Sequence, residues 1–195
     1  MTHQSHVKQL HSLDHQFLVA MPNLDGGYFE KAVIYIVEDN ETGTMGINLT
    51  QPMPTMNIET LLSHFKYEIK GQYDYLADPV FAGGPVDVER GFVLHRPIDD
   101  WQSSMTLSDR LAMTVSEDLL KGLAEGQGPQ DFIVALGYSG WKPNQLNAEL
   151  QSNSWLTLPY NEALLFEVPA ERKWQVALST LGVTPEFLSM EAGHA

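Results

Sequence analysis

The longest apolar runs in this chain of 195 residues are only as long as a strand, and this constrains the fold more than any other feature. Residues 32–37 and 132–136 are two such runs. A typical strand has about five or six residues, whereas a helix that crosses a bilayer needs about 20 consecutive apolar residues. Hydrophobic residues nevertheless make up 43% of the chain, enough to fill a sizeable core. The sequence therefore predicts a sheet of short strands and no membrane partner.

Turn and helix signals divide the chain into short elements. Residues 39–43 have turn chemistry between two β-prone segments, which indicates a hairpin. Residues 58–65 carry apolar side chains at helical spacing, and Asn57 before them is a candidate N-cap. The predicted strands are residues 17–20, 32–38, 44–50, 80–82, 91–95, 105–107, 111–115, 132–137, 155–158 and 164–168. The predicted helices are residues 58–65, 116–126 with Ser116 as cap, 145–151 and 170–181, with a last short helix capped by residues 184–185.

These elements alternate irregularly, with hairpins interleaved among helices. A doubly wound parallel sheet needs regular strand–helix–strand alternation, so the pattern argues against it. We predict the α+β class, with a mixed, largely antiparallel curved sheet or partial barrel and helices packed outside. No repeat or linker divides the chain, so residues 1–195 are expected to form one domain. Residues 1–12 are polar and rich in His, which predicts a flexible segment rather than a signal peptide.

The chain is strongly acidic, with 25 Asp and Glu residues against 11 Lys and Arg residues and a formal net charge of −14. Nonspecific nucleic-acid binding relies on cations that replace counterions on phosphates, so this charge disfavours direct contact with DNA or RNA. The absence of cysteine excludes disulfides, thiol catalysis and cysteine-based metal sites. It is consistent with a reducing compartment, and we expect a cytoplasmic protein.

Several short motifs follow one another in a characteristic order along the chain. They are FLVAMP at residues 17–22, VIYI at 33–36, GTMG at 43–46, GGPV at 83–86, RGFVLH at 90–95, GQGP at 126–129, LGYSGW at 136–141 with Gln145 and Leu146, NSWL at 153–156 and AGHA at 192–195. In this order and spacing, residues 10–195 resemble the YqgE/AlgH family of bacterial proteins. The resemblance implies a bifurcated sheet folded into a pseudo-barrel with helices. It implies no agreed biochemical activity, although one branch is named for the regulation of alginate synthesis.

The chain departs from the family pattern at several positions. Asn144 stands where members often carry Gly, but Asn tolerates the left-handed backbone of a tight turn better than most residues. Asn147 replaces a frequent Glu, so a mechanism that needs an acid at this position is in doubt. Thr50, Ser139 and Lys142 stand where Asn, Ala and Gly are frequent.

Candidate binding residues lie in and around two glycine-containing segments. Residues 137–144 are the strongest candidate, because they combine aromatic faces, a cation and the free N–H groups of a helix start, which suit an anion. Core packing of the two aromatic side chains is an equally good interpretation. The predicted binding residues are Gly83, Gly84, Arg90, His95, Tyr138, Trp141, Lys142, Gln145 and His194.

No catalytic residue is predicted. Ser139 follows a strand and precedes a helix, as a hydrolase nucleophile does, but position 141 is Trp where that motif requires Gly. His95 is interpreted as a partly buried strand residue in preference to a general base. The glycine motifs lack the spacing of nucleotide-binding loops, and His64 and His95 belong to no metal-binding array. We therefore predict no metal and no cofactor.

Three functions are considered. The first is a cytoplasmic accessory or regulatory protein that binds a protein or a small anionic ligand and performs no catalysis. The alternative is a cofactor-independent enzyme acting on a phosphorylated or nucleotide-like substrate, with residues 83–95 and 137–144 converging around a pocket. The third, disfavoured by charge, is a transcriptional regulator that contacts DNA directly. The oligomeric state stays open.

Two further expectations concern single sites. Arg90 is expected to be held by a carboxylate or by backbone carbonyls, because a tight turn would return it toward the two glycines of the preceding motif. Residues 193–195 are expected to dock near residues 83–95 or 137–144, because a docked turn would explain the Gly of the terminal motif.

Overall fold

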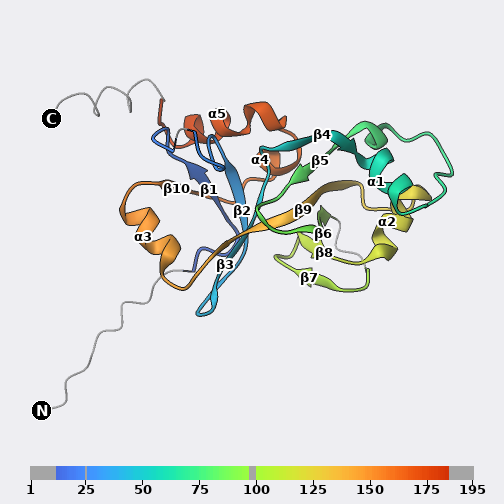
Figure 1. The fold of residues 1–195 in the computed structure, drawn as a ribbon, viewed down its shortest axis with the longest axis horizontal. Helices are drawn as coiled ribbons and strands as arrows, with labels where there is room; N and C mark the ends of the chain where they lie inside the picture. The colour runs from blue at the N-terminus through green and yellow to red at the C-terminus, as the bar shows by residue number, and fades with distance from the viewer. Residues whose placement is uncertain (1–11, 25, 97–99, 185–195) are drawn as a thin grey trace, which may run out of the picture.

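The computed structural model describes residues 12–24, 26–96 and 100–184 (Figure 1). Its centre is a curled sheet that forms a half-barrel, and among the described residues every strand pair except β5–β9 is antiparallel. The strands are β1 (Gln16–Ala20), β2 (Val33–Asn40), β3 (Gly43–Asn48), β4 (Pro52–Asn57), β5 (Pro79–Ala82), β6 (Val86–Arg96), β7 (Ser104–Thr106), β8 (Ala112–Thr114), β9 (Asp131–Trp141) and β10 (Trp155–Pro159). The helices are α1 (Ile58–His64), α2 (Glu117–Ala124), α3 (Gln145–Gln151), α4 (Glu162–Phe166) and α5 (Ala170–Thr180), with a 3₁₀ turn η1 (Asp74–Ala77).

Strand β9 is the axis of the sheet, whose order is β10-β1-β2-β3-β9-β6-β8-β7. On one side β9 pairs with β6. On the other side its first half pairs with β5, at Phe81 and Ala135, and its last residues pair with β3, at Thr44 and Trp141. The change of neighbour falls at Gly137, whose φ of 75° only glycine adopts easily. The sheet therefore divides along β9, as a bifurcated sheet requires.

The main hydrophobic core lies inside the curl, and α4 and α5 pack against it. Phe17, Tyr35 and Leu94 from the sheet are buried there with Leu165 and Leu178 from the two helices. Helices α1 and α2 cover a second core on the opposite face of β6 and β9, and α3 covers a third. In Figure 1, α5 lies above the strands, α3 lies at the left end of the molecule, and α1 and α2 lie together at the right end. This arrangement confirms the predicted α+β class, with helices packed outside a curved sheet.

Residues 164–168 were predicted to form a strand, but residues 164–166 belong to helix α4 and residues 167–168 to the turn after it. Asn161 accepts a hydrogen bond of 3.0 Å from the backbone N–H of Leu164 and thereby caps α4. Leu164 and Leu165 are both buried, against the sheet and α5. A short segment rich in apolar residues has no clear period of its own, so the cap and the tertiary packing decide its conformation.

Three local details differ from what the sequence suggests. Strand β9 continues to Trp141, beyond the predicted end of that strand at residue 137. Ser116 stands at the N-cap of α2, but its hydroxyl donates to the carbonyl of Gln102 at 2.6 Å and does not cap the helix. Strand β4 begins with Pro52, which discourages a strand assignment. It pairs only with β5, and an edge strand tolerates a residue without an N–H donor.

In the part of the chain that the structure describes, no helix is long and apolar enough to cross a membrane. The last predicted helix, the terminal motif and nearly all of residues 1–12 lie outside the described residues.

Candidate functional site

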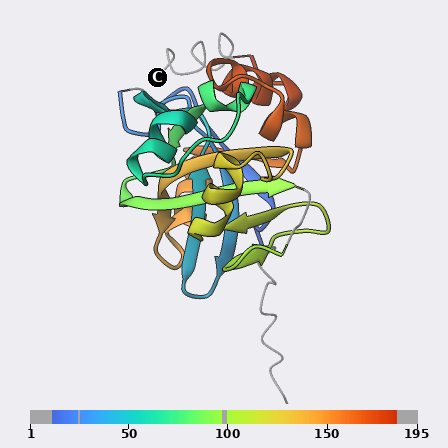
Figure 2. The same ribbon diagram turned by 90° about the vertical axis from the view of Figure 1, so that its right-hand side faces the viewer.

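A cavity of about 650 Å³ opens on the concave side of the half-barrel, next to the main core. It is bounded by the β2–β3 hairpin, the end of β9, the first half of β6, and β7 with β8. Figure 2 shows the β2–β3 hairpin and β7 projecting on the same side of β6. The lining residues are Glu38, Asn40, Thr42, Gly43, Thr44, Met45, Val86, Arg90, Phe92, Ser103, Met105, Met113, Val115, Tyr138, Gly140, Trp141, Lys142 and Pro143.

The floor of the cavity is apolar and aromatic. Phe92 and Met113 are buried and belong to the main core, and Met45 and Tyr138 pack against it. The Phe92 and Tyr138 rings meet edge to face, with centroids 5.9 Å apart. Met105 is the direct neighbour of Met113 across β7 and β8, and it is 37% exposed. The floor thus offers flat rings beside flexible thioethers, which adapt to the shape of an apolar ligand.

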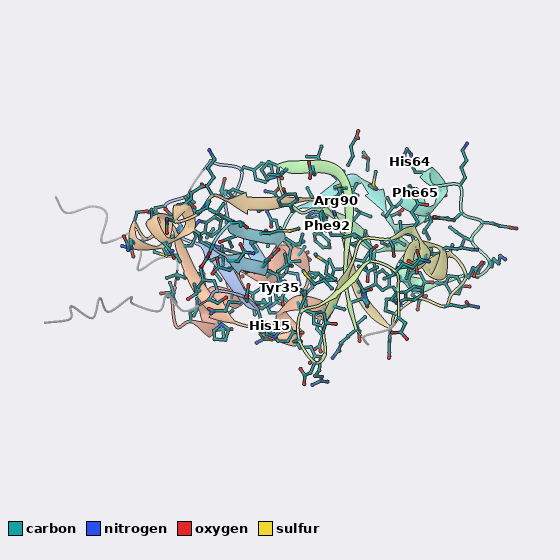
Figure 3. The ribbon with its side chains drawn as sticks, turned by 90° about the horizontal axis from the view of Figure 1, so that it is seen from below. His15, Tyr35, His64, Phe65, Arg90 and Phe92 are labelled. Carbon is teal, nitrogen blue, oxygen red and sulfur yellow. The ribbon has the colours of Figure 1, made fainter. Side chains whose placement is uncertain are left out.

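Arg90 stands on the wall of this cavity. Its Cζ atom lies 5.4 Å from the centroid of the Phe92 ring, and the two side chains lie together in the middle of the molecule in Figure 3. Among the described residues, no carboxylate and no carbonyl accepts a hydrogen bond from Arg90, so the predicted structural clamp is wrong. The pairing of β6 with β9 is irregular between Val86 and Gly91. Arg90 lies in that irregular stretch and is exposed.

Two other charged side chains line the cavity. Lys142 follows β9, and its backbone N–H donates to Oε1 of Gln145 at 3.0 Å. Its ammonium group is exposed and has no ion-pair partner in the described part of the chain. Glu38, on β2, accepts a hydrogen bond of 2.6 Å from Nδ2 of Asn40. The lining therefore carries two cations against one carboxylate, in a protein whose net charge is −14.

Gly83 and Gly84 do not line the cavity. They are buried where the β5–β6 connection crosses β9. The N–H of Gly83 donates to the carbonyl of Leu136 at 2.8 Å. A Cβ atom on Gly84 would lie 2.0 Å from the backbone carbon of Tyr138. These glycines bring the two motif segments into backbone contact, and the N–H of Gly83 is engaged there rather than free to bind a phosphate.

His95 points away from the cavity and is fully buried. Its Nε2 atom lies 2.7 Å from Oγ1 of Thr114, which in turn lies 2.5 Å from Oγ of Ser104. Gln145 does not line the cavity but holds the backbone of Lys142. His194 and the predicted docking of residues 193–195 lie outside the described residues. The structure thus brings together Arg90, Tyr138, Trp141 and Lys142 from the predicted set.

A second polar cluster ties the start of β1 to β2 and β10. Nδ1 of His15 lies 2.6 Å from Oη of Tyr35, and the imidazole stacks on Tyr160 with centroids 4.2 Å apart. Burial lowers the pKa of His15, and the nearby Asp109 carboxylate partly offsets this. His15 and Tyr35 are labelled together in Figure 3, apart from Arg90. Since His15 and Tyr35 are hydrogen-bonded to each other and Tyr160 contributes a ring stack, we assign this cluster to the structure of the sheet.

Sequence reasoning missed the hairpin residues and the methionines of the cavity. Met45 lies in the motif at residues 43–46 and Glu38 in the predicted strand before it, but neither carries a local sign of a binding role, because they reach the site only through the curl of the sheet. The pairing of Met105 with Met113 could have been predicted. Each lies four residues from residue 109, the centre of the predicted turn, so the two face each other across the hairpin. Among the described residues, no cluster of three or more His, Cys, Asp or Glu side chains could hold a metal ion. The arrangement is suited to holding an anion with an apolar body.

Comparison with known proteins identifies relatives over the whole chain. The sequence profile of the AlgH-like family matches residues 17–186. A UPF0301 protein of Hydrogenovibrio crunogenus is 56% identical over 190 residues, which cover 96% of this chain and 100% of the relative. A UPF0301 protein of Vibrio cholerae is 44% identical over 187 residues, which cover 94% of this chain and 100% of the relative.

Two solved structures are similar to the fold. The solution structure of the AlgH protein from Pseudomonas aeruginosa is 38% identical, with a TM-score of 0.75 and complete coverage of both chains. The crystal structure of a protein from Corynebacterium diphtheriae shares the fold at 19% identity, with a TM-score of 0.66 and 85% coverage of each chain.

Proposed function

This chain belongs to the AlgH-like family, and from that premise we propose that it is a cytoplasmic accessory or regulatory protein that binds a small organic anion. The observation that carries the proposal is the convergence of two motif segments on one cavity. Arg90 comes from the first segment, and Tyr138, Trp141 and Lys142 come from the second. At about 650 Å³, the cavity has the size of a small-molecule site.

The charge distribution supports an anionic ligand. The protein as a whole repels anions, yet Arg90 and Lys142 line the cavity without ion-pair partners among the described residues. A bound anion would compensate the net positive charge that remains beside Glu38. Its apolar part would cover the exposed side of Met105 and the rings below it. This favours a small ligand over the protein partner that the sequence left equally open.

The enzyme alternative gains less from the geometry. An enzyme of this kind requires residues 83–95 and 137–144 to converge around a pocket, and part of each segment does line the cavity. His95, its expected base, is instead buried against Thr114. Ser139 is also buried and is absent from the cavity lining.

The third function, direct binding of DNA, also gains little from the geometry. DNA-binding proteins usually contact the phosphates with many basic residues, whereas two cations line this cavity.

Further parts of the proposal concern organisation and location. We infer that residues 1–195 form one domain, because β9 pairs with strands from both halves of the chain. The lack of cysteine supports the cytoplasmic assignment.

Native mass spectrometry of the protein purified from its own cells tests the proposal. We expect a bound mass that dissociates on denaturation. The double variant Arg90→Ala/Lys142→Ala should lose this mass. The matched control Arg172→Ala/Lys121→Ala removes the same charge from exposed helix positions away from the cavity and should keep it. Loss of the mass in both double variants, or retention in both, would show that the cavity is not the binding site.

A further inference from the structure

We propose that the ligand is an aromatic carboxylic acid, held by its carboxylate on Arg90 and by its ring on the floor of the cavity. This inference rests on the proposed function, which requires only a small organic anion. It adds the charge and the shape of that anion, and three features of the cavity support it.

The first feature is the surroundings of Arg90. Its Cζ atom lies 5.4 Å from the Phe92 centroid, within the range of a cation–π contact. A guanidinium that stacks on a ring keeps its N–H groups available in its own plane. No described residue accepts a hydrogen bond from these groups of Arg90. A carboxylate can therefore accept two parallel hydrogen bonds from a guanidinium that already contacts the Phe92 ring.

The second feature is the balance of charge. Arg90, Lys142 and Glu38 together leave one net positive charge on the cavity wall. A carboxylate carries one negative charge, whereas a phosphate monoester carries nearly two above pH 7. Glu38 and the acidic remainder of the protein would repel the second charge. The wall is thus matched to a monoanion.

The backbone also disfavours a phosphate. Phosphate sites commonly use free N–H groups of glycine loops and helix starts. Here the N–H of Gly83 donates to Leu136, and the N–H of Lys142 donates to Gln145. Gly84 lies against the backbone of Tyr138, with no room for a ligand atom between them. The N–H groups of Gly83 and Lys142 are therefore already engaged within the protein and are not available to a phosphate.

The third feature is the floor. Phe92 and Tyr138 present one edge-to-face pair, and Met105 and Met113 stand side by side on the neighbouring strands. Thioethers make favourable contacts with aromatic rings, and they adjust to a flat ligand more easily than branched side chains do. A ring attached to the carboxylate would lie between these groups, next to the Arg90 anchor.

Isothermal titration calorimetry of the full chain at pH 8 with three naphthyl probes tests the inference. The probes are 2-naphthoate, 2-naphthyl phosphate and the neutral 2-naphthylmethanol. We expect 2-naphthoate to bind at least about ten-fold more tightly than either of the others. Arg90→Ala should weaken 2-naphthoate by about ten-fold or more and make the acid and the alcohol equal. Arg90→Lys should recover part of the loss, and Arg172→Ala should cause none.

The possible failures separate the two proposals. Tighter binding of 2-naphthyl phosphate would overturn the carboxylate inference and leave an anion-binding function in place. Equal binding of the acid and the alcohol to the unmodified chain would overturn both, because Arg90 would then contribute nothing. If none of the three probes binds, the aromatic inference is wrong, and the retained mass in native mass spectrometry still decides the proposed function. Because Arg90 is exposed, its variants should fold, and their melting temperatures verify this.

Discussion

The hydroxyl of Ser139 donates a hydrogen bond of 3.1 Å to the backbone carbonyl of Gly83. The same carbonyl accepts a hydrogen bond of 2.8 Å from the N–H of Asn48. One oxygen atom therefore ties the β5–β6 connection to both β9 and β3, at the point where the sheet divides. Ser139 is fully buried, and its hydroxyl is engaged in this contact. We therefore expect Ser139 to stabilise the sheet rather than to act as a nucleophile.

Replacing Ser139 with Ala should therefore lower stability only slightly. The variant loses one neutral hydrogen bond, and the carbonyl of Gly83 keeps its bond from Asn48, so we expect a loss of about 1 kcal/mol or less in the free energy of unfolding. Urea denaturation measures this loss. Ligand binding should be unchanged. A variant of unaltered stability that no longer bound its ligand would place Ser139 in the functional site.

Gly84→Ala should be far more damaging. The added methyl group would lie 2.0 Å from the backbone carbon of Tyr138 and 2.2 Å from the backbone N of Ser139, and neither backbone atom can move aside without breaking β9. We expect a loss of at least about 3 kcal/mol, or failure to fold. Gly91→Ala is the matched control, because its nearest neighbour would be a Leu136 methyl group at 3.8 Å. Equal melting temperatures for the two variants would contradict this account.

Local signals in the sequence determined much of the fold. Asn57 caps α1, its own backbone N–H donates in return to the Thr60 hydroxyl, and α3 spans the predicted residues 145–151. Gly182 follows α5 with a φ of 71°. Each of these features depends on residues close together in the chain. Residues 164–168 were assigned wrongly because their conformation depends on packing against α5, which is not encoded locally.

The candidate site was predicted in part, and strand geometry explains the remainder. Side chains alternate between the faces of a strand, so Phe92 and Leu94 face the main core while Val93 and His95 face the other way. The predicted strand over residues 91–95 already implied that His95 and Phe92 could not share a site. Glu38 and Met45 could not be found in this way. They join the cavity because the sheet curls, and curvature has no signature in a single sequence.

Glu149 links two tryptophans, and Glu149→Gln should disturb both. Its Oε2 atom accepts hydrogen bonds from the indole nitrogens of Trp141 at 2.9 Å and Trp155 at 2.8 Å, while Oε1 accepts from Gln145. An amide replaces one acceptor oxygen with a donor and removes the charge. We expect a loss of about 2 kcal/mol and a change in tryptophan fluorescence. Glu171→Gln, on the exposed side of α5, should change neither property.

Lys173 should give the protein a distinctive dependence on alkaline pH. The side chain is buried, and its Nζ atom donates to the carbonyls of Leu164 and Leu165. Burial lowers the pKa of Lys173 from 10.5 to about 8. Between these values the unfolded chain binds more protons than the folded chain, so this residue makes folding more favourable as pH rises. A neutral amine still has two N–H groups for the two carbonyls.

Comparison with Lys173→Met isolates this effect from other titrating groups. Relative to the variant, the unmodified protein should gain up to about 3 kcal/mol in the free energy of unfolding between pH 8 and 10.5. Urea denaturation at a series of pH values measures the gain. Lys121→Met, at an exposed position of α2, should follow the unmodified protein. Parallel pH profiles for the unmodified protein and Lys173→Met would show that the buried amine does not lose its proton in this range.

Glu38→Gln should change which anions the cavity accepts. The substitution removes the carboxylate that lines the cavity with Arg90 and Lys142, and leaves two net positive charges in place of one. A Gln carbonyl can still accept the hydrogen bond from Asn40, so the hairpin should keep its conformation. Binding of 2-naphthyl phosphate should strengthen by about ten-fold, and binding of 2-naphthoate by clearly less, because the second negative charge gains more from losing a like-charged neighbour. Glu41→Gln, in the same hairpin but outside the cavity lining, is the control for a change in net charge alone. If both glutamine variants strengthened the two probes equally, the preference for a monoanion would reflect the overall charge of the protein, and Glu38 would have no part in selecting the ligand.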